Sequence, residues 1–198
     1  GYATDSGAAS GAKCHFLNSD KLFFEVGGTI AYSFTTTQVF RDFAKFYHLY
    51  IEWDTTQATA SDRYKVFLNG VQITAFDSIS YPALNYAGTQ WGSNDLSNFC
   101  YGYTSGQSPD GYIARLALVD GSCPGYAAFG RVSADTGAWV WKNPTGITWG
   151  NKGFFLEFNT GASASDLGID TSGNGNTFTV TNLSVTAGAG NDWLADTP

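Results

Sequence analysis

The sequence predicts an all-β fold in which two antiparallel sheets pack face to face as a β-sandwich. Apolar and polar residues alternate with a period of two in many short runs, which is typical of strands because successive side chains point to opposite faces. Gly, Asn and Asp, the usual residues of tight turns, separate the runs. No window shows the i, i+3, i+4, i+7 apolar stripe of an amphipathic helix, and only one helical turn, near 126–129, is expected.

The first half of the chain contains the clearest strands. A hairpin is predicted where the runs 21–26 and 29–34 flank Gly27-Gly28. A further alternating run covers 47–54. The loop TTQATASDR that follows it is polar and lacks apolar periodicity, which places it at the surface.

An Asn-Gly pair then joins two more alternating runs, 64–68 and 71–76. Asn69-Gly70 in this position is the strongest short hairpin signal, because a type I′ turn needs positive φ at both central residues. Together with 47–54, these runs predict three consecutive antiparallel strands.

The second half repeats the pattern with runs bounded by Gly, Asn and Asp. Strands are predicted within 111–121, 137–143, 153–159 and 176–185. Aromatic residues make up 16% of the chain, which suits the space between two sheets, and the 24 glycines suit the turns.

Length and charge narrow the function classes. With 198 residues the chain is long enough for one domain, and we expect a single β-sandwich over 1–198. The sequence has no run of 18 apolar residues, so no membrane span is predicted. A formal charge of −7 argues against nucleic acid as a partner, because phosphate contacts need clustered Lys and Arg.

Methionine and cysteine content give two further expectations. The chain has no methionine, which predicts that it is a processed or trimmed part of a longer product. Its three cysteines allow at most one internal disulfide: either Cys100 pairs with Cys123, or Cys14, Cys100 and Cys123 are all thiols. With no Cys-x-x-Cys pair and only two histidines, a zinc site is not expected.

Several longer motifs occur in a fixed order along the chain. They are TTTQVFRD, WDTTQATASDRYKVFLNGVQITAF, DGYIARLALVDG, TGAWVWK, GFFLEF and LGIDTSGNGNTFTVTNLSVTAGAGND. From about Thr35 to the end, this series resembles the laminin G-like, concanavalin A-like lectin/glucanase modules of virion structural proteins in tailed bacteriophages. The resemblance implies a two-sheet jelly roll in a tail, fibre or head appendage, located on the extracellular particle, with recognition of host-surface sugar as a common role.

The sharpest catalytic candidates are Glu52 and Asp54, in the segment Glu-Trp-Asp-Thr-Thr-Gln. Glucanases of this fold carry carboxylates at alternate strand positions, which places an acid and a nucleophile on one face beside the same glycosidic bond. Here Thr56 or Gln57 replaces the third carboxylate of the pattern, and Asp54 sits at a strand end, where Asp commonly serves a turn. The favoured interpretation is that no residue is catalytic.

A second candidate is the segment Asp170-Thr-Ser-Gly-Asn174-Gly-Asn176. Closely spaced Asp and Asn oxygens can surround Ca²⁺, so Asp170, Asn174 and Asn176 are the candidate ligands. The alternative, which we favour, is a tight turn that needs Asp, Asn and Gly for its own geometry.

A third candidate is a set of aromatic residues in loops rich in Gly, Ser and Asn, on which sugar rings could stack. Its members are Trp91, Tyr101, Tyr103 and Trp149. In so aromatic a chain, packing is the competing interpretation.

The sequence therefore favours a non-enzymatic structural and adhesive module of a phage particle, which binds host carbohydrate or stabilises the particle. Its partners would be other virion proteins, and it would form a homo-oligomer or part of a larger assembly. Two alternatives stay open: a decoration protein of capsid or tail that contacts only virion proteins, and a glycoside hydrolase of the same fold.

Overall fold

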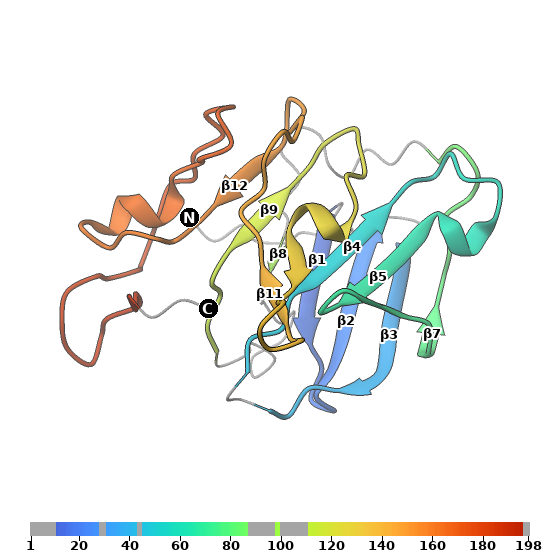
Figure 1. Cartoon of the computed structure of the whole chain (residues 1–198), viewed down its shortest axis with the longest axis horizontal. Helices are drawn as coiled ribbons and strands as arrows, with labels where there is room; N and C mark the ends of the chain where they lie inside the picture. The colour runs from blue at the N-terminus through green and yellow to red at the C-terminus, as the bar shows by residue number, and fades with distance from the viewer. Residues whose placement is uncertain (1–10, 28–30, 43–44, 87–97, 100–110, 196–198) are drawn as a thin grey trace. The chain divides into compact units, whose positions relative to one another are not determined.

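The computed structural model describes residues 11–27, 31–42, 45–86, 98–99 and 111–195 (Figure 1). They belong to two compact units, Gly1–Gly111 and Tyr112–Pro198. The prediction of an all-β fold is confirmed: the described residues form several sheets, and their helical segments are 3-10 turns. None of these is long and apolar enough to cross a membrane. The single domain over 1–198 stays a prediction.

The first unit contains a five-stranded sheet. Its strands are β1 (Gly11–Phe16), β2 (Lys21–Gly27), β3 (Ala31–Val39), β7 (Phe76–Ile79) and β8 (Asn98–Phe99). They lie in the order β7-β3-β2-β1-β8, and every pair is antiparallel except β1 with β8. The predicted pairing of the runs 21–26 and 29–34 is confirmed, because β2 and β3 pair from Lys21 opposite Val39 to Gly27 opposite Ala31. The predicted two-residue turn Gly27-Gly28 is wrong, because Gly27 belongs to β2 and pairs with Ala31.

The second sheet of this unit has three antiparallel strands, β4 (Leu49–Trp53), β5 (Tyr64–Leu68) and β6 (Val71–Ile73), in that order. This confirms the predicted triplet. Asn69 and Gly70 have φ of 48° and 78°, which confirms the type I′ turn. The predicted strand 71–76 is wrong in one respect: after Ile73 the chain leaves this sheet, and Phe76 begins β7 in the other sheet.

The two sheets of the first unit share one apolar core. Phe24 and Phe34 of the larger sheet contact Tyr64 of the smaller sheet, with ring centroids 6.0 and 5.4 Å apart. Val66 lies in the same core and is fully buried. The sheets therefore pack face to face as in a sandwich, and each fully buried aromatic or aliphatic side chain contributes roughly 1.5–3 kcal/mol.

A bulge shapes the end of this core. The pairing of β2 with β3 shifts register between Lys21 and Phe23. At the shift the Leu22 amide donates to the Thr36 hydroxyl over 3.1 Å, and that hydroxyl donates to the Gln38 carbonyl over 2.9 Å. Thr36 is fully buried, so its hydroxyl supplies a partner that the ladder alone would not.

The second unit has two small antiparallel sheets. One pairs β10 (Gly130–Val132) with β11 (Trp139–Trp141), and the other pairs β9 (Leu116–Leu118) with β12 (Phe154–Leu156). β9, β11 and β12 fall within three of the predicted runs, whereas β10 lies in none of them. The 3-10 turn η3 (Tyr126–Ala128) confirms the predicted helical turn. A further 3-10 turn, η4 (Ala164–Gly168), precedes the Asp170 segment.

The strand predicted over 176–185 is wrong. These residues have no ladder partner among the described residues, although the Phe178 amide donates to the Gly168 carbonyl over 2.8 Å. The Phe178 ring packs edge-on against Phe154 with centroids 4.8 Å apart, yet the residue is 47% exposed. Alternation expresses only local preference, and a strand also needs a neighbouring edge to pair with.

Candidate functional site

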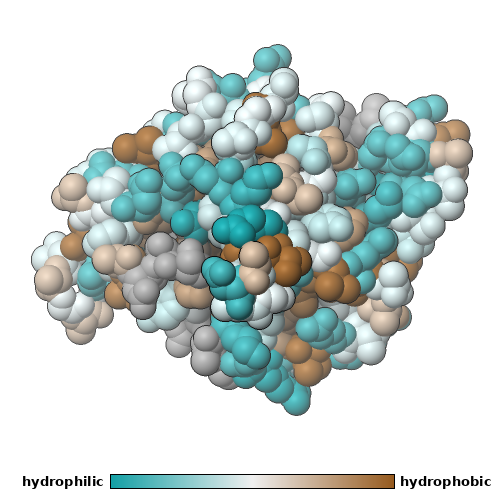
Figure 2. Space-filling model, viewed as in Figure 1, coloured by the Kyte–Doolittle hydropathy of each residue, from teal (hydrophilic) through white to brown (hydrophobic). Residues whose placement is uncertain are grey.

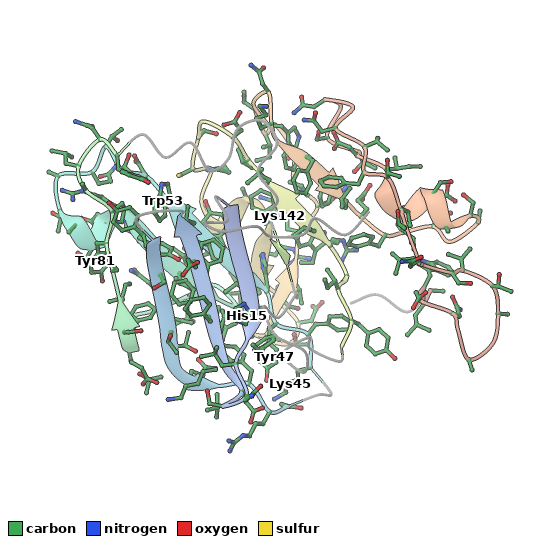
Figure 3. The ribbon with its side chains drawn as sticks, turned by 180° about the vertical axis from the view of Figure 1, so that it is seen from behind. His15, Lys45, Tyr47, Trp53, Tyr81 and Lys142 are labelled. Atoms are coloured by element: carbon green, nitrogen blue, oxygen red, sulfur yellow. The ribbon has the colours of Figure 1, made fainter. Side chains whose placement is uncertain are left out.

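A groove of about 310 Å³ opens beside β6 in the first unit. It is lined by Ser61, Asp62, Tyr64, Gln72, Ile73, Thr74, Phe76 and Tyr81. Its walls come from the 3-10 turn η1 (Ala60–Asp62), from the end of β6 and from the start of β7. Tyr81 lies close to η1 and β7 (Figure 3). We call this the β6 groove.

Arg63 holds one wall of the β6 groove in place. Its guanidinium donates to the carbonyls of Gln57 and Ala58, both over 2.7 Å, and to the carbonyl of Pro82 over 2.9 Å. The planar fork of Arg can serve several acceptors at once, so one side chain ties the polar loop to the segment that follows β7. One side of the groove is therefore the loop with Ser61 and Asp62. The other side is the segment with Tyr81, next to Pro82.

Two backbone and side-chain contacts reinforce this connection. The Asn85 amide donates to the Thr55 carbonyl over 2.8 Å. The Thr55 hydroxyl donates to the Tyr86 carbonyl over 3.1 Å. The loop TTQATASDR is at the surface, as predicted, but it is tied down at both ends.

Aromatic rings form the apolar part of the groove. Tyr64 is buried beneath it, whereas Phe76 and Tyr81 are half-buried and pack against the core. The Phe76 ring contacts Phe34 with centroids 5.5 Å apart, which restrains its position. Half-buried rings of this kind offer a ligand an apolar surface, and little side-chain entropy is lost when the ligand binds.

The polar part carries one carboxylate with a nearby cation. Lys65 lies with its Nζ 3.5 Å from Asp62 Oδ1 and 3.7 Å from Glu52 Oε1. The Glu52 and Lys65 side chains are 18% and 24% exposed, while Asp62 is 48% exposed and accessible from the groove. Lys65 thus offsets the charge of two carboxylates next to the site.

A second groove, of about 370 Å³, lies along the same strand. It shares Gln72, Ile73 and Thr74 with the first, and its other lining residues are Thr37, Gln38, Leu68, Val71 and Ala75. Thr37 at the end of β3 and Ala75 lie on this lining, and the Thr37 amide donates to the Ala75 carbonyl over 3.4 Å. Lys21 also forms an ion pair with Asp77 near this end of the larger sheet.

The two carboxylates considered for catalysis already have partners. Glu52 stands opposite Lys65 in the ladder of β4 with β5 and lies within reach of its ammonium. Asp54 follows the strand and accepts hydrogen bonds from the Thr56 amide, the Thr56 hydroxyl and the Gln57 side-chain amide, at 3.0, 2.6 and 2.6 Å. Those bonds from Thr56 and Gln57 lower the pKa of the Asp54 carboxyl, the opposite of what a general acid requires.

The predicted cation ligands Asp170, Asn174 and Asn176 do lie together. Asp170 Oδ1 accepts from the amides of Phe155 and Ser172, both at 2.9 Å. Its Oδ2 accepts from the Ser172 hydroxyl at 3.0 Å and the Asn176 amide at 2.8 Å. Burial would raise the pKa of this carboxyl, but the bonds from Phe155, Ser172 and Asn176 outweigh burial and lower it.

The two asparagines extend the same turn toward a neighbouring loop. Asn174 Nδ2 donates to the carbonyls of Gly150 and Gly153, the latter over 2.8 Å. Asn176 Nδ2 donates to the carbonyls of Asn151 and Gly153 over 3.0 and 2.9 Å. The segment therefore serves as a hydrogen-bonded turn that joins loop 150–153, and the described residues contain no cluster of His, Cys, Asp and Glu that could hold a metal ion.

Of the four candidate aromatic residues, Trp149 is the one that the structure describes. Its ring stacks on Phe155 with centroids 5.6 Å apart and 12° between the planes, and it contacts Phe129 edge-on. Trp149 is half-buried in this cluster rather than displayed on a loop tip. Trp91, Tyr101 and Tyr103 lie outside the described residues.

The structure describes two of the three cysteines. Cys14 is buried in β1 and Cys123 is exposed in the second unit. Cys100 lies outside the described residues, so its pairing with Cys123 stays a prediction.

The β6 groove was not predicted. Tyr81 and Phe76 carry no motif, and Arg63 stands at the end of a loop that sequence reasoning placed only at the surface. The one available signal was Arg63 itself, a charged residue next to a strand in a chain of low charge. Comparison with known proteins found no matching family model, no similar curated protein and no similar solved structure.

Proposed function

We propose that this chain is a non-enzymatic structural and adhesive module of a virus particle, of concanavalin A-like jelly-roll type, and that it binds host-surface carbohydrate in the β6 groove. The observation that carries the proposal is the lining of this groove. Half-buried Phe76 and Tyr81 lie beside the polar side chains of Ser61, Asp62 and Gln72. The series of motifs that resembles tailed-phage virion modules supports the particle context.

The chemistry of a sugar ring matches this combination. A pyranose has an apolar C–H face that can pack on an aromatic ring and a rim of hydroxyls that need hydrogen-bond partners. Tyr81 and Phe76 offer the first, and Ser61, Asp62 and Gln72 offer hydroxyl, carboxylate and amide groups for the second.

Binding without turnover fits the carboxylates of this unit. Hydrolysis of a glycosidic bond by the usual route needs two carboxyl groups flanking the bond, one of them protonated. Asp62 is the carboxylate of the β6 groove, whereas Glu52 is held near Lys65 and Asp54 is engaged in its turn. We therefore expect modest affinity per site, with several copies on a particle supplying useful adhesion.

Binding can be tested with immobilised bacterial envelope polysaccharides and the purified chain. Tyr81→Ala removes the ring from the groove and should weaken binding about tenfold or more. Tyr112→Ala is the matched control, because Tyr112 is 74% exposed in the second unit and outside the groove.

Three results would overturn the proposal. Equal loss in both variants would place binding elsewhere, and release of reducing sugar would favour the glycoside hydrolase. A chain that binds no polysaccharide, yet is present in fixed stoichiometry in purified particles, would favour the decoration protein.

A further inference from the structure

Strand β6 forms an edge of the three-stranded sheet. β5 pairs with it on one side, and no described strand pairs with it on the other. Leu68 lies opposite Val71 across the two-residue turn, and Val66 lies opposite Ile73. In such a hairpin these two pairs exchange the backbone hydrogen bonds, and the pair between them does not.

The register therefore directs the peptide groups of Gln72 away from β5. Phe67, its opposite neighbour, lies in register with Tyr50 of β4 on the other side. The Asn69 amide donates to the His48 carbonyl over 2.9 Å, as the same alternation requires. The N–H and C=O of Gln72 point away from β5, to the edge on which no described strand pairs with β6.

Of the features that protect natural edge strands from pairing, this edge has a short length but no charge and no proline. Natural edge strands carry Lys, Pro or a bulge, which prevent another strand from adding. The stretch VFLNGVQITAF, residues 66–76, contains no charged residue and no proline. Val71 is 70% exposed, and Gln72 and Thr74 are exposed as well. On the face shown in Figure 2, hydrophobic residues occur in small groups among hydrophilic ones.

The absence of charge on this edge allows a second copy of the chain to be the partner. The chain has a formal charge of −7, so most contacts between two copies would bring like charges together. An uncharged edge avoids this cost locally. The edge is also self-complementary, because an antiparallel pair centred on Gln72 lets each copy donate one hydrogen bond to the other and accept one in return.

We propose that two copies of this chain associate through β6, in an antiparallel pair with Gln72 opposite Gln72 and Val71 opposite Ile73 of the second copy. The two three-stranded sheets then join into one continuous sheet across a two-fold axis. Because β6 is short, the contact is small, and the dimer is weak and reversible. Salt strengthens it, because salt screens the repulsion between two acidic chains.

Two substitutions at Gln72 separate the contribution of its backbone N–H to dimerisation from that of its side chain. Gln72→Pro removes the N–H that points to the open edge, a position where an edge strand tolerates proline. Gln72→Thr is its control, because it shortens the side chain and keeps the N–H. Val71→Glu adds a charge to the edge, and Val132→Glu adds the same charge at a valine that is 61% exposed in the second unit.

Sedimentation of the full chain at roughly millimolar concentration should show a monomer–dimer equilibrium that shifts toward dimer as salt is raised to about 0.5 M. Gln72→Pro and Val71→Glu should weaken the dimer about tenfold or more, while Gln72→Thr and Val132→Glu should leave it within about twofold. The Gln72 amide should exchange with solvent more slowly in concentrated than in dilute protein. If Gln72→Pro does not fold, Val71→Glu and amide exchange still decide the matter.

A chain that is monomeric under all these conditions would overturn the proposal, as would a dimer that both edge variants retain, or an edge that pairs only with a different protein. Gln72 also lines the β6 groove, so carbohydrate and a second copy of the chain would compete for this strand, and carbohydrate is left out of the sedimentation experiment. Tyr81→Ala should bind carbohydrate weakly and still dimerise like the parent chain. Failure of the parent chain to dimerise therefore overturns pairing through β6 alone, because carbohydrate binding is measured separately with dilute protein.

Discussion

The Asp170 carboxylate accepts a hydrogen bond of 2.9 Å from the backbone amide of Phe155. This contact joins the turn that follows η4 to β12, the strand whose Phe155 ring stacks on Trp149. Since Asp170 is 9% exposed and accepts three more hydrogen bonds from its own turn, its ionised form is built into the second unit.

Asp170→Asn should lower the free energy of unfolding by about 2–3 kcal/mol near neutral pH, because the amide cannot accept all four hydrogen bonds. The folded-state pKa of Asp170 lies below its ordinary value, so the carboxylate stabilises the fold at pH above about 4, and this contribution is lost as the pH falls through the folded pKa. The parent chain should therefore lose more stability than the variant between pH 5 and 2, roughly. Urea unfolding at each pH, followed by tryptophan fluorescence, measures the stability of the parent chain and of the variant. Asp135→Asn, at an exposed loop position, should change stability by no more than about 0.5 kcal/mol.

Calcium should not stabilise the protein. A cation at Asp170 would have to displace donors that already occupy both carboxylate oxygens, and the Asn174 and Asn176 amides face backbone carbonyls through their nitrogens. The midpoint of thermal unfolding should be the same in excess Ca²⁺ and in EDTA. A calcium-dependent rise in the midpoint that Asp170→Asn abolishes would instead identify the turn as a cation site, because a ligand that binds the folded state raises its stability.

Arg63→Lys should loosen one wall of the β6 groove without removing a charge. Lys has a single ammonium and cannot reproduce the three contacts to Gln57, Ala58 and Pro82. The Asn85 amide, which bonds to the Thr55 carbonyl, should then exchange with solvent severalfold faster. Arg131→Lys in β10 is exposed and should leave this rate unchanged, whereas an equal rate in Arg63→Lys would mean that the guanidinium does not hold the loop.

Tyr64→Phe should leave stability unchanged or raise it by up to about 1 kcal/mol. Tyr64 is 2% exposed, and its hydroxyl has no hydrogen-bond partner among the described residues. Burial raises the pKa of this hydroxyl, so it stays protonated and its removal exposes no charge. Tyr64→Leu removes the ring that contacts Phe24 and Phe34 and should cost about 2–4 kcal/mol in urea unfolding. A loss of comparable size in Tyr64→Phe would show that the hydroxyl is bonded.

Thr36→Val keeps the shape of the side chain but removes both hydrogen bonds at the bulge. The Leu22 amide would be left without its acceptor in a buried position, and we expect a loss of about 1–3 kcal/mol. Thr35→Val, on the opposite face of the same strand, should change stability by less than about 0.5 kcal/mol. Equal effects in calorimetry would mean that the hydroxyl of Thr36 does not stabilise the bulge.

The candidate site shows how far local patterns reach. The sequence offers Asp170, Asn174 and Asn176 as candidate cation ligands, with a tight turn as the favoured interpretation, and the structure brings these three residues together. Composition could not decide whether their oxygens would face a cation or protein donors, since that depends on where Phe155, Gly150 and Gly153 lie. For Trp149, too, the neighbouring residues decide its role: the ring stacks on Phe155 and is not displayed on a loop for a sugar to stack on.

By itself, the sequence determined the all-β class, the antiparallel pairing of β2 with β3, and the triplet β4, β5 and β6 with its turn at Asn69-Gly70. These features depend on alternation and on positive φ, which are properties of neighbouring residues. Only the tertiary structure decided that the chain changes sheets after Ile73 and that 176–185 has no ladder partner among the described residues. It also decided that Asp62 and Tyr81 line one groove, with Arg63 bonded to the Pro82 carbonyl beside it. The physical reason is that strand pairing, burial and side-chain hydrogen bonds need partners distant in sequence, and the pattern of a single segment carries no information about where those partners lie.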